Sequence, residues 1–288
     1  MGNNSFTVLP MSQRFFLEPG ETYTGEIAVV NPADATEDFA YQAAVTPYSV
    51  TEEDYTADLT TDHNRSMITK WIKINEPTGI VAPNESRIIK FTITVPENAP
   101  SGGQYATITV ASNNNFQSSG SVSVQNIFEI ASVIYANVAG ETVHSGEILE
   151  NNIPGFVTTI PVRLTASISN NGNVHEDATF VITVSDLFTG RVVLPTEENN
   201  GQYNELIMPE TTKQIDREVS NLPTVGIIKI NQTIYYNGEV SIVEKNVIIC
   251  PIWFMILFVT IIISVIVSVI MIVRKHKKNK KIQTNVRS

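Results

Sequence analysis

Short stretches in which apolar and polar residues alternate recur throughout the first 246 residues. In residues 22–30, Tyr23, Gly25, Ile27 and Val29 fall on one face. The same alternation recurs at residues 89–95, 106–110, 162–168, 180–184 and 228–230. Successive side chains of a strand point to opposite faces, so this pattern predicts strands with one face in a core. No ten-residue window before residue 247 shows convincing helical periodicity, and we therefore expect an all-β structure.

Turn-forming residues separate these stretches. They are Pro19-Gly20, Asn31-Pro32, Pro83-Asn84 and the segment 100–103, then the segment 170–173, Thr189-Gly190 and Asn237-Gly238. Asn-Gly between two strands is the strongest short signal for a tight hairpin. Short strands with turns at this spacing predict tandem immunoglobulin-like antiparallel β-sandwiches. The length suggests two such domains, residues 1–135 and 136–246, with a short joint at 140–146.

Residues 247–273 form an apolar segment that contains no charged residue. About 20 apolar residues suffice for a helix to cross a bilayer core, so we expect a single transmembrane helix. The alternative, a buried core helix, fits poorly because no small domain needs so long an uncharged helix. Trp253 lies near the outer boundary, where an indole ring suits the interface.

Charge on the two flanks of this segment predicts its orientation. The tail, residues 274–288, carries seven Lys and Arg residues and no acidic residue. Residues 240–246 carry only Glu244 and Lys245. Basic residues stay on the cytoplasmic side, which predicts a plasma-membrane protein with an extracellular N-terminus and a cytoplasmic tail beside anionic lipid. Export requires a signal peptide, which we expect was removed or lies before a misassigned start.

The net charge of −10 combines the basic tail with an acidic remainder. Without the tail, 12 basic residues stand against 29 acidic ones, which gives −17. This balance argues against nucleic acid as a partner. The single cysteine, Cys250, lies in the apolar segment, so no disulfide holds the outer part together. That usage favours a bacterial surface protein with full hydrophobic cores.

Residues 48–70 interrupt the alternating pattern with an acidic, polar stretch. It contains Glu52, Glu53, Asp54, Asp58 and Asp62. Such a loop could bind a ligand or cation, but it lacks a calcium-loop motif, which favours a solvated excursion.

The chemistry of known active sites is missing from the sequence. The four histidines, His63, His144, His175 and His276, are scattered, and we expect them on the surface. No nucleophile elbow, phosphate-binding loop or metal-ligand spacing occurs. The sequence therefore predicts no catalytic, cofactor or metal site. Residues 222–226 have the wrong order for a wall-sorting signal, so the chain should stay in the membrane.

Several short segments carry a resemblance to a known family. They are residues 5–10 (SFTVLP), 16–21 (FLEPGE) and 27–31 (IAVVN), Val95-Pro96 and Gly102-Gly103. They resemble the domain-of-unknown-function 916 family, the WxL-interacting proteins of Gram-positive cell surfaces. The order of two β domains, one span and a basic tail is also similar. The resemblance implies a first domain that contacts peptidoglycan and a second that engages other surface or host proteins.

Taken together, these features favour a membrane-anchored bacterial cell-surface protein that acts as a non-enzymatic binding or scaffold module. Its expected partners are the cell wall or other surface proteins. One alternative is an assembly factor, similar to pilus chaperones, that pairs an exposed edge strand with a partner strand. A second is an enzyme with an unrecognised carboxylate site.

Overall fold

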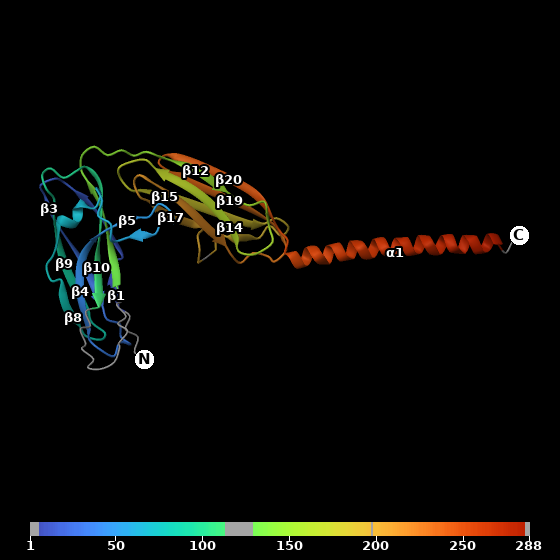
Figure 1. Ribbon diagram of the computed structural model, residues 1–288, viewed down its shortest axis with the longest axis horizontal. Coiled ribbons are helices and arrows are strands. Elements are labelled where there is room, and N and C mark those ends of the chain that lie inside the picture. Colours follow the sequence, from blue (N-terminus) through green and yellow to red (C-terminus); the bar gives the residue numbers. More distant parts are fainter. Residues whose placement is uncertain (1–5, 113–128, 197, 286–288) are drawn as a thin grey trace. The chain divides into compact units, whose positions relative to one another are not determined.

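The computed structural model describes residues 6–112, 129–196 and 198–285. It contains two β-sandwiches followed by one long helix, which confirms the predicted fold class (Figure 1). By packing, the chain divides into two compact units. The first comprises Met1–Ile148, Ile168–Ala178 and Glu205–Gln214, and the second comprises Leu149–Ser167, Thr179–Asn204 and Ile215–Ser288.

Two sheets form most of the first unit. One has the order β1 (Thr7–Leu9), β3 (Thr22–Val30), β9 (Ser86–Thr94) and β7 (Ile72–Ile74). The other has the order β2 (Ser12–Leu17), β11 (Glu129–Val138), β10 (Gly102–Ser112), β4 (Phe39–Pro47) and β8 (Thr78–Val81). Neighbouring strands are antiparallel except β2 and β11, which run parallel.

The core of the first unit lies on the faces that the alternation predicts. Ile27 and Val29 of β3 are buried, as are Ile89, Phe91 and Ile93 of β9. The segment 48–70 contains β5 (Ser49–Val50), β6 (Ala57–Asp58) and the 3-10 helix η1 (Met67–Lys70). This helix contributes a fully buried side chain to the same core, so the end of the acidic stretch is part of the sandwich.

The second pair of sheets has three strands on one side and six on the other. The smaller has the order β12 (Gly146–Asn152), β14 (Val162–Asn170) and β18 (Thr211–Val219). The larger has the order β13 (Phe156–Val157), β20 (Glu239–Ile249), β19 (Gly226–Tyr236), β15 (Glu176–Asp186) and β16 (Val192–Leu194), while β17 (Gln202–Ile207) also pairs with β15. The short β13 runs parallel to β20.

The predicted hairpin at Asn237-Gly238 is confirmed between β19 and β20. Asn237 has φ of 46° and Gly238 has φ of 78°, and the strands pair from Tyr236 and Glu239 outward. Positive φ at both central residues is the geometry that the Asn-Gly pair favours. The Asn-Gly pair therefore predicted both the position of the turn and the positive φ angles of its two central residues.

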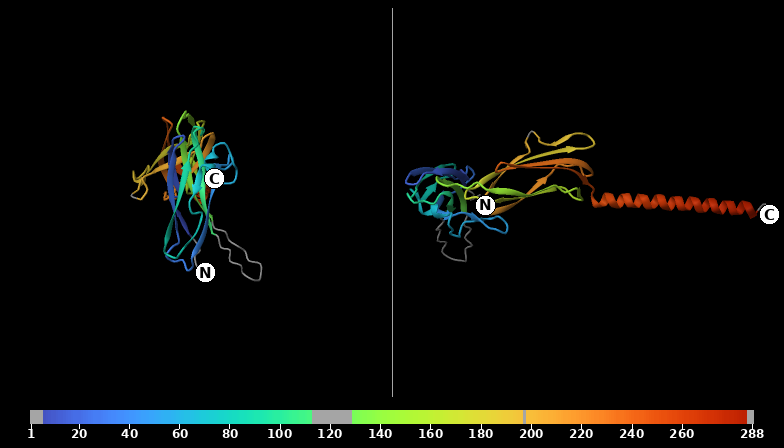
Figure 2. Two further views of the ribbon diagram at one scale, coloured as in Figure 1. Left: turned by 90° about the vertical axis from the view of Figure 1, so that its left-hand side faces the viewer. Right: turned by 90° about the horizontal axis from the view of Figure 1, so that it is seen from above.

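The end of the chain differs from the sequence expectation. Strand β20 continues to Ile249, and helix α1 (Ile252–Asn285) begins after Pro251, so the first residues of the predicted span 247–273 belong to a strand. The side chains of Val247 and Ile249 are buried in the sandwich core, as expected for alternate residues of a strand. The residue between them and those that follow are also apolar, so the alternation is not visible in the sequence. Figure 2 shows the helix as one continuous element. Its segment Ile252–Arg274 has a mean hydropathy of 3.3 and is not buried against the rest of the chain.

Candidate functional site

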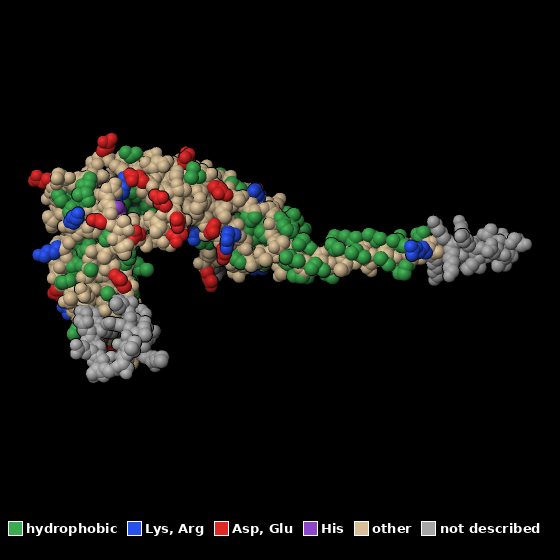
Figure 3. Space-filling view, in the orientation of Figure 1, with side chains coloured by type: hydrophobic (Ala, Val, Ile, Leu, Met, Phe, Trp, Pro, Cys, Tyr) green, Lys and Arg blue, Asp and Glu red, His purple; other side chains and the backbone are tan. Residues whose placement is uncertain are grey.

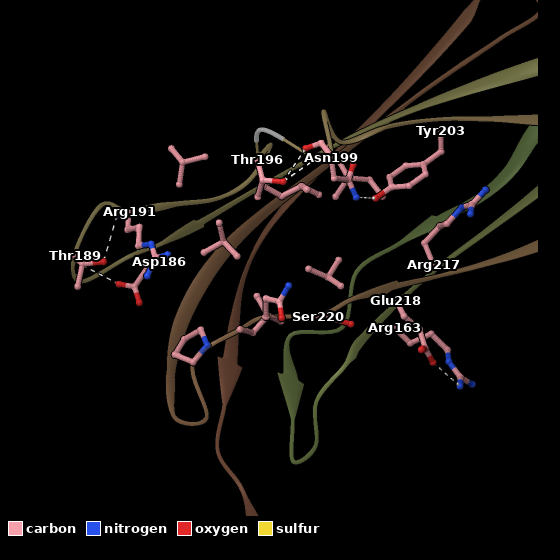
Figure 4. A pocket seen from close by; sticks show the side chains of 18 of the residues that line it. Arg163, Asp186, Thr189, Arg191, Thr196, Asn199, Tyr203, Arg217, Glu218 and Ser220 are labelled. Atoms are coloured by element: carbon pink, nitrogen blue, oxygen red, sulfur yellow. Dashed lines mark hydrogen bonds and ion pairs between the residues drawn. The ribbon is translucent and has the colours of Figure 1, made fainter.

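The second unit contains an open groove of about 1200 Å³, built from both of its sheets (Figure 4). Strands β14 and β18 of the smaller sheet contribute one wall. Strands β15, β16 and β17 of the larger sheet contribute the other, and the loop after β18 completes the lining. All the lining residues belong to the second unit.

The floor of the groove is apolar. Leu194 and Val219 belong to the hydrophobic core, and Val193 and Leu222 are partly buried against it. These side chains come from the end of β16, the end of β18 and the following loop. The groove is therefore a place where the sandwich core reaches the surface between two sheets.

Charged side chains surround this floor. Arg163 Nη2 of β14 lies 3.3 Å from Glu218 Oε1 of β18, and both side chains are more than half exposed. The Arg217 guanidinium lies over the ring of Tyr203, 4.9 Å from its centroid. Arginine stacked on an aromatic ring in this way keeps its donors in a fixed plane. At the other end in Figure 4 lie Asp186, Thr189 and Arg191.

Both sheets end along this side of the sandwich. Among the described residues, β18 has a single strand neighbour, β14, and β16 has a single neighbour, β15. An edge strand presents backbone N–H and C=O groups that can pair with another chain. The groove thus combines two strand edges with an apolar floor and a charged rim.

A compact turn closes one end of the groove. The carboxylate of Asp186 accepts the backbone N–H groups of Phe188 at 2.9 Å and of Thr189 at 2.7 Å. The N–H of Gly190 bonds to the carbonyl of Asp186 at 2.9 Å. The hydrogen bonds that the carboxylate accepts from Thr189 and from the backbone of Phe188 lower the pKa of Asp186. The turn therefore has a defined shape although its tip is exposed.

A polar aromatic cluster lies on β10 and β11 in the first unit. The hydroxyl of Tyr105 accepts the backbone N–H of His175 at 3.0 Å and lies 3.3 Å from its Nδ1. The rings of Tyr105, Tyr135 and His175 lie in mutual contact. Burial raises the pKa of both tyrosines and lowers the pKa of His175 to about 4, so His175 is neutral at neutral pH. The expectation that His175 lies on the surface is wrong, because its ring is largely buried against these tyrosines.

The other histidines have different environments. His63 Nε2 lies 3.0 Å from the carbonyl of Tyr48. His144 is exposed and contacts Glu176. The side chain of His276 lies outside the described part of the structure.

Three acidic side chains of the segment 48–70 cap turns within that segment. Asp54 accepts the hydroxyl of Thr56 at 2.8 Å, and Asp58 accepts the N–H of Thr60 at 2.9 Å. Asp62 accepts the hydroxyl of Ser66. Hydrogen bonding lowers the pKa of each of these carboxyl groups. The segment is not simply a solvated excursion, because the hydroxyl of Tyr55 accepts the backbone N–H of Met208 at 2.7 Å and Ile68 is buried in the core. The described residues include no cluster of His, Cys, Asp and Glu that could hold a metal ion.

Comparison with known proteins yields structural likenesses alone. No protein-family model and no curated protein matches the sequence. The class 5 fimbriae chaperone CfaA is similar at 17% identity, over 84% of this chain and 99% of that chain, with a TM-score of 0.41. A chain from the chaperone–tip adhesin complex of CFA/I fimbriae is similar at 15% identity, over 84% and 98%, also with a TM-score of 0.41. The CsuC–CsuE chaperone–tip adhesion subunit complex of Acinetobacter baumannii contains a similar chain at 13% identity, over 84% and 98%, with a TM-score of 0.39. At these TM-scores the likeness carries no argument about binding.

Proposed function

We propose that this protein is a membrane-anchored, non-enzymatic surface module that binds an extended segment of a partner protein in the groove of the second unit. The observation that carries the proposal is the coincidence of the groove with two strand edges, β18 and β16. The sequence raised the alternative that an exposed edge strand pairs with a partner strand. We adopt that alternative and assign the pairing to the edges of β18 and β16.

An extended peptide suits this groove for physical reasons. Main-chain hydrogen bonds to an edge strand supply affinity, and pockets for alternate side chains supply specificity. The apolar floor at Val193, Leu194 and Leu222 would receive the side chains that face inward. Arg217 stacked on Tyr203 would favour an acidic side chain at one outward position, whereas Arg163 is already paired with Glu218.

Membrane anchorage is the second part of the proposal. The apolar segment Ile252–Arg274 is long enough to cross a bilayer and has no partner surface in the described chain. Exposed to water, such a helix would present a continuous apolar surface, which soluble proteins avoid. The basic tail supports a topology in which the two sandwiches lie outside the cell.

Binding can be tested with the full chain in lipid nanodiscs. Extended peptides selected from a random displayed library should bind and should slow amide hydrogen exchange in β18 or β16. Val193→Asp and Leu222→Asp should each weaken binding at least about tenfold, because a buried unpaired carboxylate is costly. The matched control is Ile242→Asp on the exposed face of β20, which should bind normally. Selected peptides whose protection maps to other strands would contradict the proposal.

Peptidoglycan contact by the first domain, implied by the family resemblance, is a separate proposal. Nanodiscs containing the full chain should then co-sediment with isolated cell-wall sacculi, and Leu222→Asp should leave that co-sedimentation unchanged. Absence of co-sedimentation at both low and moderate salt would remove the wall from the set of partners while leaving the groove proposal intact.

A further inference from the structure

Apolar side chains are exposed where β20 approaches the helix. Phe156 of β13 is paired in register with Ile248 of β20, and Ile248 is paired with Ile227 of β19. The N–H of Leu187 bonds to the carbonyl of Ile227 at 3.0 Å, which places the turn 187–190 beside the same strands. We call Phe156, Leu187, Phe188 and Ile248 the apolar rim.

The apolar rim is unusually open to solvent for side chains of this type. Phe188 is 74% exposed, Phe156 is 50% exposed, and Leu187 and Ile248 are 49% and 44% exposed. Figure 3 shows hydrophobic side chains gathered at the end of the second unit that adjoins the helix. Contiguous exposed apolar patches on folded domains mark protein or membrane contacts.

The turn that presents Phe188 has a fixed conformation. Asp186 accepts two of its backbone N–H groups, and the carbonyl of Asp186 accepts a third. None of these bonds needs Leu187 or Phe188 to be apolar, so the turn alone does not explain their identity. An exposed Leu-Phe pair on a preformed turn is suited to an apolar surface outside the domain.

Charge at this end of the sandwich differs from charge in the rest of the outer chain. The loops 158–161, 187–191 and 220–225 all meet strand ends in register with the end of β20. Together they contain no Asp or Glu and one basic residue, Arg191, although the chain has 29 acidic residues. Apart from Asp186, whose carboxylate accepts N–H groups within the turn, this end presents little negative charge that would repel anionic headgroups.

The short connection between β20 and α1 indicates that the surface covering the apolar rim is the membrane. Cys250 and Pro251 alone separate the last residue of β20 from the start of α1. Three Cα–Cα steps from Ile249 to Ile252 span at most about 10 Å. The end of the sandwich that carries the apolar rim is therefore tethered within that distance of the apolar helix.

We infer that the apolar rim inserts into the interfacial layer of the bilayer and docks the second sandwich on the membrane surface. This inference rests on the proposed membrane anchorage. Transfer of aromatic and aliphatic side chains from water to the boundary between headgroups and acyl chains lowers the free energy. The rim thus supplies a peripheral contact next to the spanning helix, with Phe188 inserting furthest.

Tryptophan quenching by brominated lipids tests the inference on the full chain in nanodiscs. The protein has two tryptophans, Trp71 and Trp253, and Trp71 is buried in the first unit. In a Trp253→Phe background, Phe188→Trp should be quenched by lipids brominated near the head of the acyl chain, and its emission should shift to the blue. The control Val240→Trp, 53% exposed at the other end of β20, should be quenched by aqueous iodide instead.

The outcomes separate the inference from the anchorage on which it rests. Quenching of native Trp253 by the same lipids reports that the helix is in the bilayer. Quenched Trp253 together with a Phe188→Trp signal that matches Val240→Trp would overturn docking of the rim and leave the anchorage standing. An unquenched Trp253 would overturn both.

Discussion

The hydroxyl of Tyr105 accepts the backbone N–H of His175 at 3.0 Å, and the same hydroxyl lies 3.3 Å from the imidazole Nδ1. Two contacts from one side chain hold the start of β15 against β10 within the first unit. Burial keeps the imidazole neutral and lowers its pKa from 6.5 to about 4. Folding of this unit is therefore linked to pH through one histidine.

Acidification should lower the stability of the first unit before most carboxylates titrate. Between pH 6.5 and about pH 4 the unfolded chain binds a proton at His175 that the folded chain excludes. The free energy of unfolding should fall over this window by at most about 3 kcal/mol. Urea unfolding followed by Trp71 fluorescence, in a Trp253→Phe background, measures the change.

The variant His175→Phe removes the titrating group and keeps an aromatic ring beside Tyr105 and Tyr135. Its free energy of unfolding should be lower at neutral pH, because the hydroxyl of Tyr105 loses a contact, but should vary less between about pH 6.5 and pH 5. A slope equal to that of the parent would exclude His175 as the source.

Arg14 and Asp177 form a second link within the first unit. The two Nη atoms of Arg14 lie 2.6 and 2.7 Å from the two carboxylate oxygens of Asp177. Both side chains are about half exposed, so solvent screens the pair. Asp177→Asn should cost about 1 kcal/mol. Glu76→Gln, which removes the single Arg87–Glu76 contact, should cost less, and equal costs would argue against a bidentate advantage.

Gly25 lies against the ring of Phe91 in the first core. A Cβ at position 25 would come within 2.2 Å of Phe91 Cζ. Gly25→Ala should therefore lower the free energy of unfolding by about 1–3 kcal/mol through overpacking. Combining it with Phe91→Leu should cost less than the sum of the two single changes, because the smaller side chain frees the space. If the costs of the two changes add strictly, as measured by unfolding followed through Trp71 fluorescence, the contact with Phe91 is not the reason why position 25 is a glycine.

The basic tail should lie on the cytoplasmic face of the membrane. The chain has one cysteine, Cys250, so Cys250→Ser allows new single cysteines to be placed. A membrane-impermeant maleimide applied to intact cells should label Val240→Cys and should leave Ser288→Cys unlabelled until the cells are opened. The reverse labelling pattern would invert the proposed topology.

Periodic segments explain why the fold was predictable. Strand β3 has the predicted range, and the predicted inward residues Ile27 and Val29 are buried because each face of a strand meets one environment. Asn237-Gly238 was also informative, since its turn requires positive φ at both positions. The end of β20 could not be predicted, because the last residues of the strand and the apolar helix that follows it form one uninterrupted apolar stretch in the sequence.

The groove was beyond the reach of sequence patterns. Tyr203 and Arg217 stack although they lie on different strands, and Leu194 and Leu222 meet at its floor from segments far apart in the chain. No local spacing reports such encounters. Exposed apolar residues such as Phe188 are visible only in the structure, because the sequence does not distinguish them from apolar residues of the core.

The two-residue connection between β20 and α1 has a consequence for how a partner is met. With the proposed membrane anchorage, a sandwich held within about 10 Å of α1 would diffuse with that helix in the plane of the bilayer. The rate at which it meets a partner then depends on the number of partner molecules per unit of membrane area, in a layer about as thick as one domain. Partners that share this layer gain a high effective concentration, whereas distant wall components must extend a flexible segment inward to be caught.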